Sequence, residues 1–105
     1  MKYLITESQF DKMIFKYLDN QDFIHIKYGT NDYLVNSEKD EYAQIRYNRI
    51  ADYCTINFEL MVEIVKFFSL SPSDAINVID RWVEKTFNVS SVVADVQKDV
   101  IVYYF

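Results

Sequence analysis

The side chains best suited to chemistry in this 105-residue chain are a single histidine, a single cysteine and many carboxylates. A structural metal site needs several such ligands to converge, usually at short and regular spacing. His25 and Cys54 lie far apart in the sequence. Glycine occurs once, whereas phosphate-binding loops and dinucleotide fingerprints need several glycines. We therefore predict no metal site and no cofactor.

Catalysis by these two residues has little support in their surroundings. His25 alternates with Lys27 in a pattern typical of a half-exposed strand. Cys54 lies between Tyr53 and Thr55, where we expect a buried thiol that packs as a small apolar side chain. A dyad of Cys54 and His25 would also lack a third group to orient it. We predict no catalytic residue, and keep an enzyme assembled from distant residues as an alternative.

Carboxylates occur in pairs four residues apart in two predicted helices. Glu59 with Glu63, and Asp80 with Glu84, have the spacing of neighbours on one helix face. Such pairs are typical of a solvated face, so we expect both pairs to be exposed and neither to act as an acid and a base.

A group of basic and aromatic residues raises the question of nucleic-acid binding, because some sheets stack single-stranded bases on aromatic rings. The group comprises Lys27, Tyr28, Tyr42, Arg46, Tyr47, Arg49 and Tyr53. However, the chain has 11 basic and 16 acidic residues and a formal net charge of −5, which repels phosphates. Aromatic residues are also common in strands for packing reasons alone. We predict that nucleic acid is not a partner and that a basic protein surface is favoured.

Length and composition indicate one intracellular domain. Half of the residues are apolar, which is enough to bury a core without metals or disulfides, so we expect residues 1–105 to form a single domain. The lone cysteine is typical of a reducing cytoplasm. The first residues lack the apolar run of a signal peptide, and the longest apolar run, residues 100–105, is too short to span a bilayer. We expect no membrane association.

The hydrophobic pattern changes its period along the chain and so predicts the elements. Thr6 as a cap, Gln9 three residues later, and Ile5 placed to pack on Phe10 predict a helix over residues 7–19. Alternating patterns then predict strands at residues 23–28, 33–35, 42–47 and 53–56, with a turn at 29–32 and an exposed loop at 36–41.

Two further helices are predicted to follow as a pair. Asn57 is a suitable cap for the first helix, and Ser71 caps the second with Pro72 at its first position. Strands at residues 92–96 and 100–105 end the chain. The order α-βββ(β)-αα-ββ keeps runs of strands apart from runs of helices, which favours an α+β domain. We expect an antiparallel sheet of about five strands with an N-terminal helix and a central helix pair.

Exposed aromatic and apolar segments point to protein contacts. The C-terminal VIVYYF has high β-propensity and no charge, so we expect it to be central in the sheet or to be covered by a partner, for example a second copy in a homodimer. The chain has nine tyrosines and eight phenylalanines, and exposed aromatic residues are frequent anchors of interfaces. The candidate contact residues are Tyr33, Tyr42, Arg46, Tyr103 and Tyr104.

Three segments carry a resemblance to a known group of proteins. MKYLITESQF (1–10), FKYLDN (15–20) and DRWVEKTFNV (80–89) resemble small uncharacterised proteins of tailed bacteriophages, especially marine and environmental ones. That group has no function to transfer. The resemblance implies a virus-encoded protein that works in the cytoplasm of a bacterial host or within the virion.

The hypothesis that these patterns favour is a noncatalytic protein-binding module, such as a phage accessory protein that docks on a host or viral protein. Three alternatives stay open. They are a structural, self-assembling virion component, an acidic inhibitor that occupies the basic surface of a nucleic-acid-binding protein, and a small enzyme of unknown type.

Overall fold

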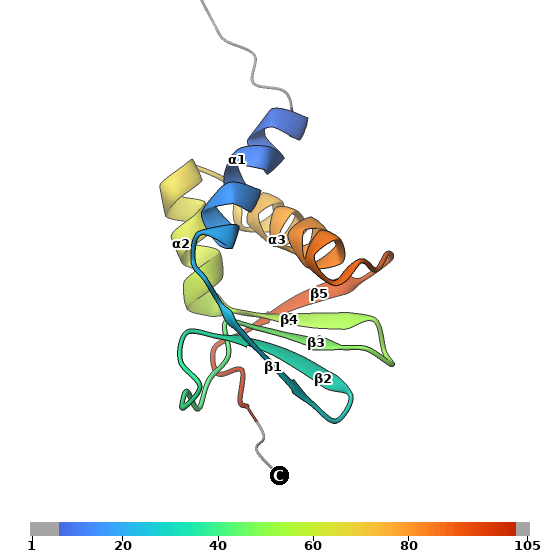
Figure 1. Ribbon diagram of the computed structural model, residues 1–105. Helices are drawn as coiled ribbons and strands as arrows, with labels where there is room; N and C mark the ends of the chain where they lie inside the picture. Colours follow the sequence, from blue (N-terminus) through green and yellow to red (C-terminus); the bar gives the residue numbers. More distant parts are fainter. Residues whose placement is uncertain (1–6, 103–105) are drawn as a thin grey trace, which may run out of the picture.

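The computed structural model describes residues 7–102. Within this range the helices and strands follow one another as α1 (Glu7–Asp19), β1 (Ile24–Tyr28), β2 (Asn31–Val35), β3 (Ile45–Asn48), β4 (Tyr53–Asn57), α2 (Phe58–Phe68), α3 (Pro72–Phe87) and β5 (Val93–Gln97). This order confirms the predicted α+β class, with an N-terminal helix and a later helix pair (Figure 1).

The sheet is mixed rather than antiparallel. Its strand order is β1-β2-β3-β4-β5, and the first four strands pair antiparallel. β5 pairs with β4 in parallel, with Thr55 opposite Asp95. The prediction of an antiparallel sheet is therefore wrong for β5. The reason is that α2 and α3 lie between the two strands and carry the chain back to the end of the sheet where β4 begins.

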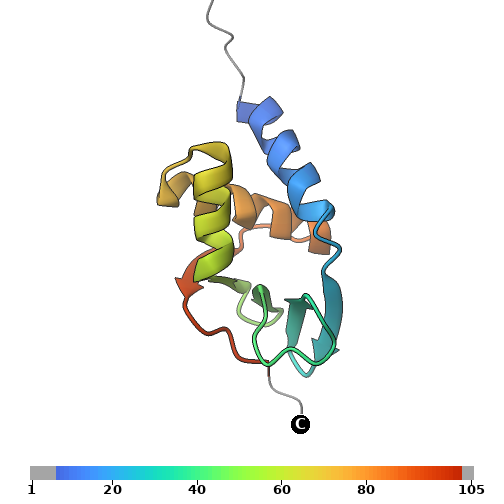
Figure 2. The same ribbon diagram turned by 90° about the vertical axis from the view of Figure 1, so that its left-hand side faces the viewer.

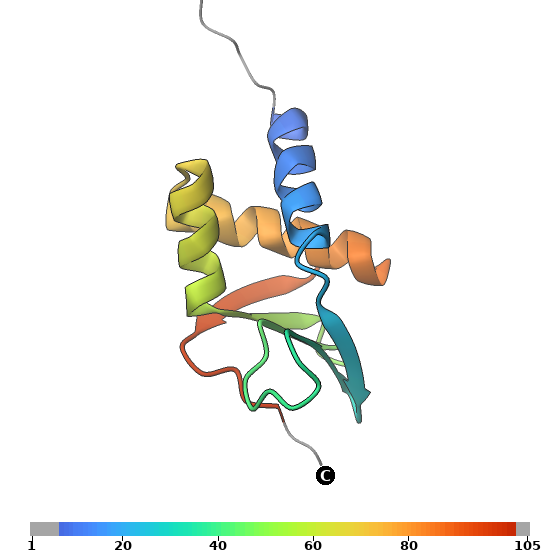
Figure 3. The ribbon, with the colours of Figure 1, turned by 60° about the vertical axis from the view of Figure 1, so that its left-hand side comes forward.

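The three helices lie together on one face of the sheet, where they enclose the main core (Figures 1 and 3). Residues that alternate along β2, β3 and β4 point toward the helices and are buried there, as the period of two predicts. The most deeply buried members of this core are Ile14, Leu18, Ile45, Cys54, Ile56, Ile64, Ala75, Ile79 and Val83.

A second, smaller core lies on the opposite face of the sheet. Tyr33 and Val35 of β2 pack there with Ala43, Val100 and Val102. The segment after β5 runs below the sheet (Figure 2) and is held by the amide of Ala43, which donates to the Val100 carbonyl at 2.7 Å. The segment after β5 thus covers the face of the sheet that is opposite to the helices.

The predicted strand at residues 100–105 is not a sheet strand in the part that the structure describes. Ile101 forms one isolated bridge with Tyr42, and the edges of the sheet are β1 and β5. Residues 103–105 lie outside the described residues, as do the predicted cap Thr6 and its neighbour Ile5.

Both predicted caps of the helix pair are confirmed. The Asn57 side chain accepts a hydrogen bond from the Glu59 amide at 2.8 Å, and the Ser71 hydroxyl accepts one from the Asp74 amide at 3.1 Å. α2 ends at Phe68, and the C-cap residue Ser69 adopts a left-handed conformation with φ of 54°. These local signals fix where α2 and α3 begin and end, and hence where the surfaces between the helices lie.

Candidate functional site

An ion pair joins the first and last helices and borders a pocket. Asp11 of α1 accepts hydrogen bonds from both Nε and Nη2 of Arg81 on α3, at 2.7 and 2.8 Å. Bidentate pairing of this kind is geometrically specific, and it fixes the distance between the two helices. The pocket beside the pair has a volume of about 460 Å³. Its lining residues, which we call the interhelical groove, are Phe10, Asp11, Ile14, Leu70, Asp74, Asn77, Val78 and Arg81.

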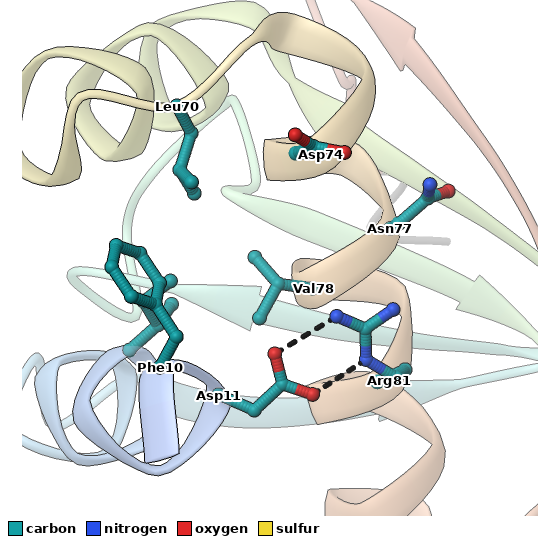
Figure 4. A pocket seen from close by; sticks show the side chains of 8 residues that line it. Phe10, Asp11, Leu70, Asp74, Asn77, Val78 and Arg81 are labelled. Atoms are coloured by element: carbon teal, nitrogen blue, oxygen red, sulfur yellow. Dashed lines mark hydrogen bonds and ion pairs between the residues drawn. The ribbon is translucent and has the colours of Figure 1, made fainter. Parts of the chain in front are cut away.

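The groove has an apolar floor and a polar rim. In Figure 4 the side chains of Phe10, Leu70 and Val78 point toward its centre from α1, the α2–α3 connection and α3. Leu70 is positioned by the end of α2, because its amide donates to the Val65 carbonyl at 3.1 Å after the left-handed turn. The rim residue Asp74 is exposed. An apolar hollow with a few polar groups at its edge is typical of a binding site.

A row of aromatic rings extends from the groove to the exposed surface of α2. Phe10 contacts Phe68 with ring centroids 6.2 Å apart, Phe68 contacts Tyr17 at 5.5 Å, and Tyr17 contacts Phe67 at 5.0 Å. We call these four residues the aromatic ridge. At its outer end Phe67 is 66% exposed. An exposed phenylalanine that continues an apolar groove marks a surface on which a partner can bury apolar area.

Two neighbours of Tyr17, Met13 and Glu63, complete the surface of the ridge. Met13, which precedes Tyr17 by one helical turn, is 52% exposed and adds a flexible apolar side chain. The Tyr17 hydroxyl donates a hydrogen bond to Glu63, and burial together with this carboxylate raises the pKa of Tyr17 to about 12. The phenol is therefore neutral at physiological pH and serves to hold α1 against α2.

The charges of the groove suit a partner with a positive charge. Asp11 and Asp74 are acidic and Arg81 is basic, and Arg81 is already bound to Asp11. Asp74 is thus the exposed charge of the groove that stands outside this ion pair, and it lies in the first turn of α3. The whole chain has a formal net charge of −5, which also attracts a positively charged partner.

The single histidine takes part in a different arrangement, at the edge of the sheet. His25 Nε2 lies 2.7 Å from Asp32 Oδ1, and Asp32 Oδ2 accepts a hydrogen bond from Arg49 Nη1 at 2.9 Å. Asp32 is buried, whereas the His25 side chain is 46% exposed, which confirms the prediction of a half-exposed strand residue. The carboxylate of Asp32 in β2 thus links this strand to His25 in β1 and to Arg49, which directly follows β3.

The single cysteine is buried in the main core, as predicted. Burial, with smaller contributions from Asp80 and Glu84, raises the pKa of Cys54 to about 12. A thiol with this pKa is protonated at physiological pH and is a poor nucleophile. Cys54 therefore acts as a small apolar core residue.

One of the two predicted exposed carboxylate pairs is not solvated. Glu59 and Glu63 are exposed, as expected, but Asp80 is half-buried, and its Oδ1 atom has no hydrogen-bond partner in the described part of the chain. Glu84 accepts a hydrogen bond from the Val92 amide at 2.9 Å. Burial and the charge of Glu84 raise the pKa of Asp80 to about 6. The prediction of an exposed pair is wrong here because this side of α3 faces the sheet around Cys54.

Of the described candidate contact residues, Tyr33 and Arg46 lie opposite each other on β2 and β3, but they do not form an exposed contact surface. Tyr33 is only 1% exposed and belongs to the second core, so its predicted exposure is wrong. Tyr42 is 46% exposed, and Arg46 is half-buried and donates to the Thr55 hydroxyl at 3.4 Å. Tyr103 and Tyr104 lie outside the described residues.

The aromatic and basic residues considered for nucleic-acid binding lie on different faces of the sheet. Tyr47 is buried against the helices, whereas Arg46 alternates with it and lies on the other face of the sheet. Sequence reasoning missed the groove because its residues come from separate helices. The apolar periods of α1 and α3 indicate which side of each helix is buried, but no local signal pairs Asp11 with Arg81.

Comparisons with protein-family models, with curated proteins and with solved structures find no match to this chain. Within residues 7–102, no group of three or more histidine, cysteine or acidic side chains is placed to hold a metal ion. In the same range, no helix is both long enough and apolar enough to cross a membrane.

Proposed function

We propose that this protein is a noncatalytic protein-binding module that docks a partner on the interhelical groove and the aromatic ridge. The observation that carries the proposal is the 66% exposure of Phe67 at the end of a row of rings that leads into an apolar pocket. Exposing this surface costs free energy in water, and a partner that covers it recovers that free energy. The resemblance to phage proteins extends the proposal to a viral accessory protein that acts on a host or viral partner.

The expected partner presents an apolar side chain next to a basic one. The apolar side chain enters the groove between Phe10, Leu70 and Val78, and the basic one faces Asp74. An amphipathic helix offers this combination on one face, with anchors three or four residues apart. Long-range attraction between the acidic chain and a basic partner raises the association rate and weakens with salt.

The first test uses affinity capture from a bacterial host lysate treated with nuclease, followed by titration calorimetry with the purified partner. We expect Phe67→Ser to weaken binding about tenfold or more, because it removes an aromatic anchor. Ile50→Ser is the matched control, since Ile50 is 79% exposed but lies in the turn between β3 and β4. This control should bind with the wild-type affinity.

Charge reversal tests the chemistry of the partner. Asp74→Lys should weaken binding at low salt, whereas Asp99→Lys, which makes the same change away from the groove, should not. A partner that binds Phe67→Ser and Asp74→Lys as tightly as the wild type would overturn the proposal. A capture that is lost on nuclease treatment would point to nucleic acid instead.

Self-assembly is the second candidate function, and the edges of the sheet favour it. β1 and β5 each pair with only one described strand, and Val93 of β5 is 61% exposed. Open edges are templates for pairing with another chain. Sedimentation velocity over a wide concentration range separates this candidate from the first. A concentration-independent monomer would contradict it.

A further inference from the structure

A second pocket, distinct from the groove, lies where α1 ends and β1 begins, against the last turns of α3. Its volume is about 330 Å³. The residues of interest in its lining are Asp19, Asp22, Phe23, His25, Trp82 and Phe87, which we call the cation pocket. The proposed partner-binding function does not use these residues, and the inference below does not depend on that function.

Aromatic rings form much of the wall, and they are held at steep angles to one another. Phe23 and Trp82 have ring centroids 6.0 Å apart and an interplanar angle of 69°. His25 and Phe87 lie 5.3 Å apart at 71°. Phe87 is further fixed by stacking on Tyr47. Both pairs are edge-to-face contacts, and all four rings line this one pocket, so they form an aromatic wall of the kind that contacts quaternary ammonium ions.

Two carboxylates border the same space without a basic partner. The Trp82 indole donates to Asp19 Oδ1 at 2.9 Å, which fixes this carboxylate at the wall. Neither Asp19 nor Asp22 makes an ion pair with a lysine or arginine in the described part of the chain, and no lysine or arginine of that part lines the pocket. The site thus has uncompensated negative charge beside apolar rings.

This combination selects one class of ligand. A neutral apolar ligand would gain nothing from the carboxylates, and an anion would be repelled by them. A metal ion would gain little from the phenylalanine rings. A trimethylammonium group satisfies both parts, because its methyl groups contact the rings while its positive charge faces the carboxylates.

We infer that the cation pocket binds a quaternary or methylated ammonium group, with Phe23 and Phe87 contacting its methyl groups and Asp19 and Asp22 facing its charge. The group occurs on free compounds such as choline and on trimethylated lysine side chains, and the two sources share this chemistry. The size of the pocket, near the lower limit for ligand sites, fits a small head group rather than a large molecule.

The test uses the intrinsic fluorescence of Trp82, the only tryptophan of the chain. Wild-type protein is titrated with choline, with an acetylated trimethyllysine amide, and with 3,3-dimethylbutanol, the uncharged isostere of choline, at constant ionic strength. We expect a saturable change with the cations and binding at least about tenfold weaker with the isostere. Whichever of choline and the trimethyllysine amide binds more tightly identifies the source of the ammonium group. The shift of the Trp82 indole proton in NMR spectra gives a second readout.

Variants separate the contributions of charge and rings. Asp22→Asn should weaken cation binding about five- to tenfold, and Asp99→Asn, on another surface, should leave it unchanged. Phe23→Leu and Phe87→Leu keep apolar volume but remove a ring, and each should also weaken binding of the cation more than that of the isostere. Equal binding of choline and its isostere, or no change in either fluorescence or NMR spectra with any cation, would overturn the inference.

Discussion

At the scale of single residues, the most informative departure from expectation is Asp80. A carboxylate four residues from another on a helix is normally solvated, yet Asp80 is half-buried, close enough to Cys54 to affect the pKa of that thiol, and one of its oxygens has no hydrogen-bond partner within residues 7–102. A buried polar group without a partner destabilises the fold, so its charge state should matter for stability.

The pKa of Asp80 predicts how stability depends on pH. Burial and Glu84 raise it from 3.8 to about 6, so the folded state binds more protons than the unfolded state between these values. Stability contributed by this group therefore falls as the pH rises from about 4 to above 6. Asp80→Asn removes the charge, and we expect it to stabilise the protein at pH 7 by about 1 kcal/mol, after allowance for solvent screening.

Urea unfolding of the wild type and of Asp80→Asn at about pH 4 and pH 7 measures this effect. The difference in the free energy of unfolding between the two proteins should be close to zero at the lower pH and should grow toward neutral pH. Asp99→Asn, an exposed change of the same kind, should show no such growth. A difference that is independent of pH would mean that Asp80 titrates as an ordinary exposed carboxylate.

At the scale of elements, Asn57 has two roles at the junction of β4 and α2. Its side-chain oxygen caps α2, while its Nδ2 donates to the Lys98 carbonyl at 3.3 Å and so ties the start of α2 to the segment after β5. Ser71 caps α3 from an exposed position through one hydrogen bond, to the Asp74 amide. Asn57 thus caps a helix and also holds the segment after β5, whereas within residues 7–102 the Ser71 side chain acts only as a cap.

The comparison of these caps gives a stability prediction. Ser71→Ala should lower the free energy of unfolding by about 1 kcal/mol, the ordinary value for a lost cap. Asn57→Ala should cost about 2 kcal/mol, because it also removes the donor of the part-buried hydrogen bond to the Lys98 carbonyl. Chemical denaturation of both variants checks the order. Equal losses would show that the contact with Lys98 contributes nothing measurable.

At the scale of the whole molecule, the sheet is covered on both faces by unequal layers. The helices cover one face, and the segment after β5 covers the other with a small core (Figures 1 and 2). This arrangement leaves the groove between the helices and the cation pocket between the helices and the sheet, and neither pocket is lined by residues of the second core. The two proposed sites can therefore be altered without disturbing the cover of the opposite face.

The second core predicts unequal effects at two adjacent positions. Val100 is fully buried, so Val100→Ala should lower the free energy of unfolding by about 2 kcal/mol through lost burial and a cavity. Ile101 is 44% exposed, and Ile101→Ala should cost less than about 1 kcal/mol. Thermal and urea unfolding measure both. If the two losses were equal, the segment would not pack on the sheet as described.

Features that depend on near neighbours along the chain could be predicted from the amino-acid pattern. The periods of 3.6 and two located the helices and most strands, and Asn57 and Ser71 marked the starts of α2 and α3 because a cap bonds to an amide two or three residues away. Burial of Cys54 followed from its place in an apolar strand.

Features that depend on contacts between distant segments became visible only in the folded chain. The parallel direction of β5 results from the path of the helix pair, and Tyr33 is buried because the segment near Val100 covers its face of the sheet. The pairing of Asp11 with Arg81, and hence the groove, requires α1 and α3 to be adjacent. Such contacts depend on how whole elements pack, and the sequence pattern of one element records only which of its sides is apolar.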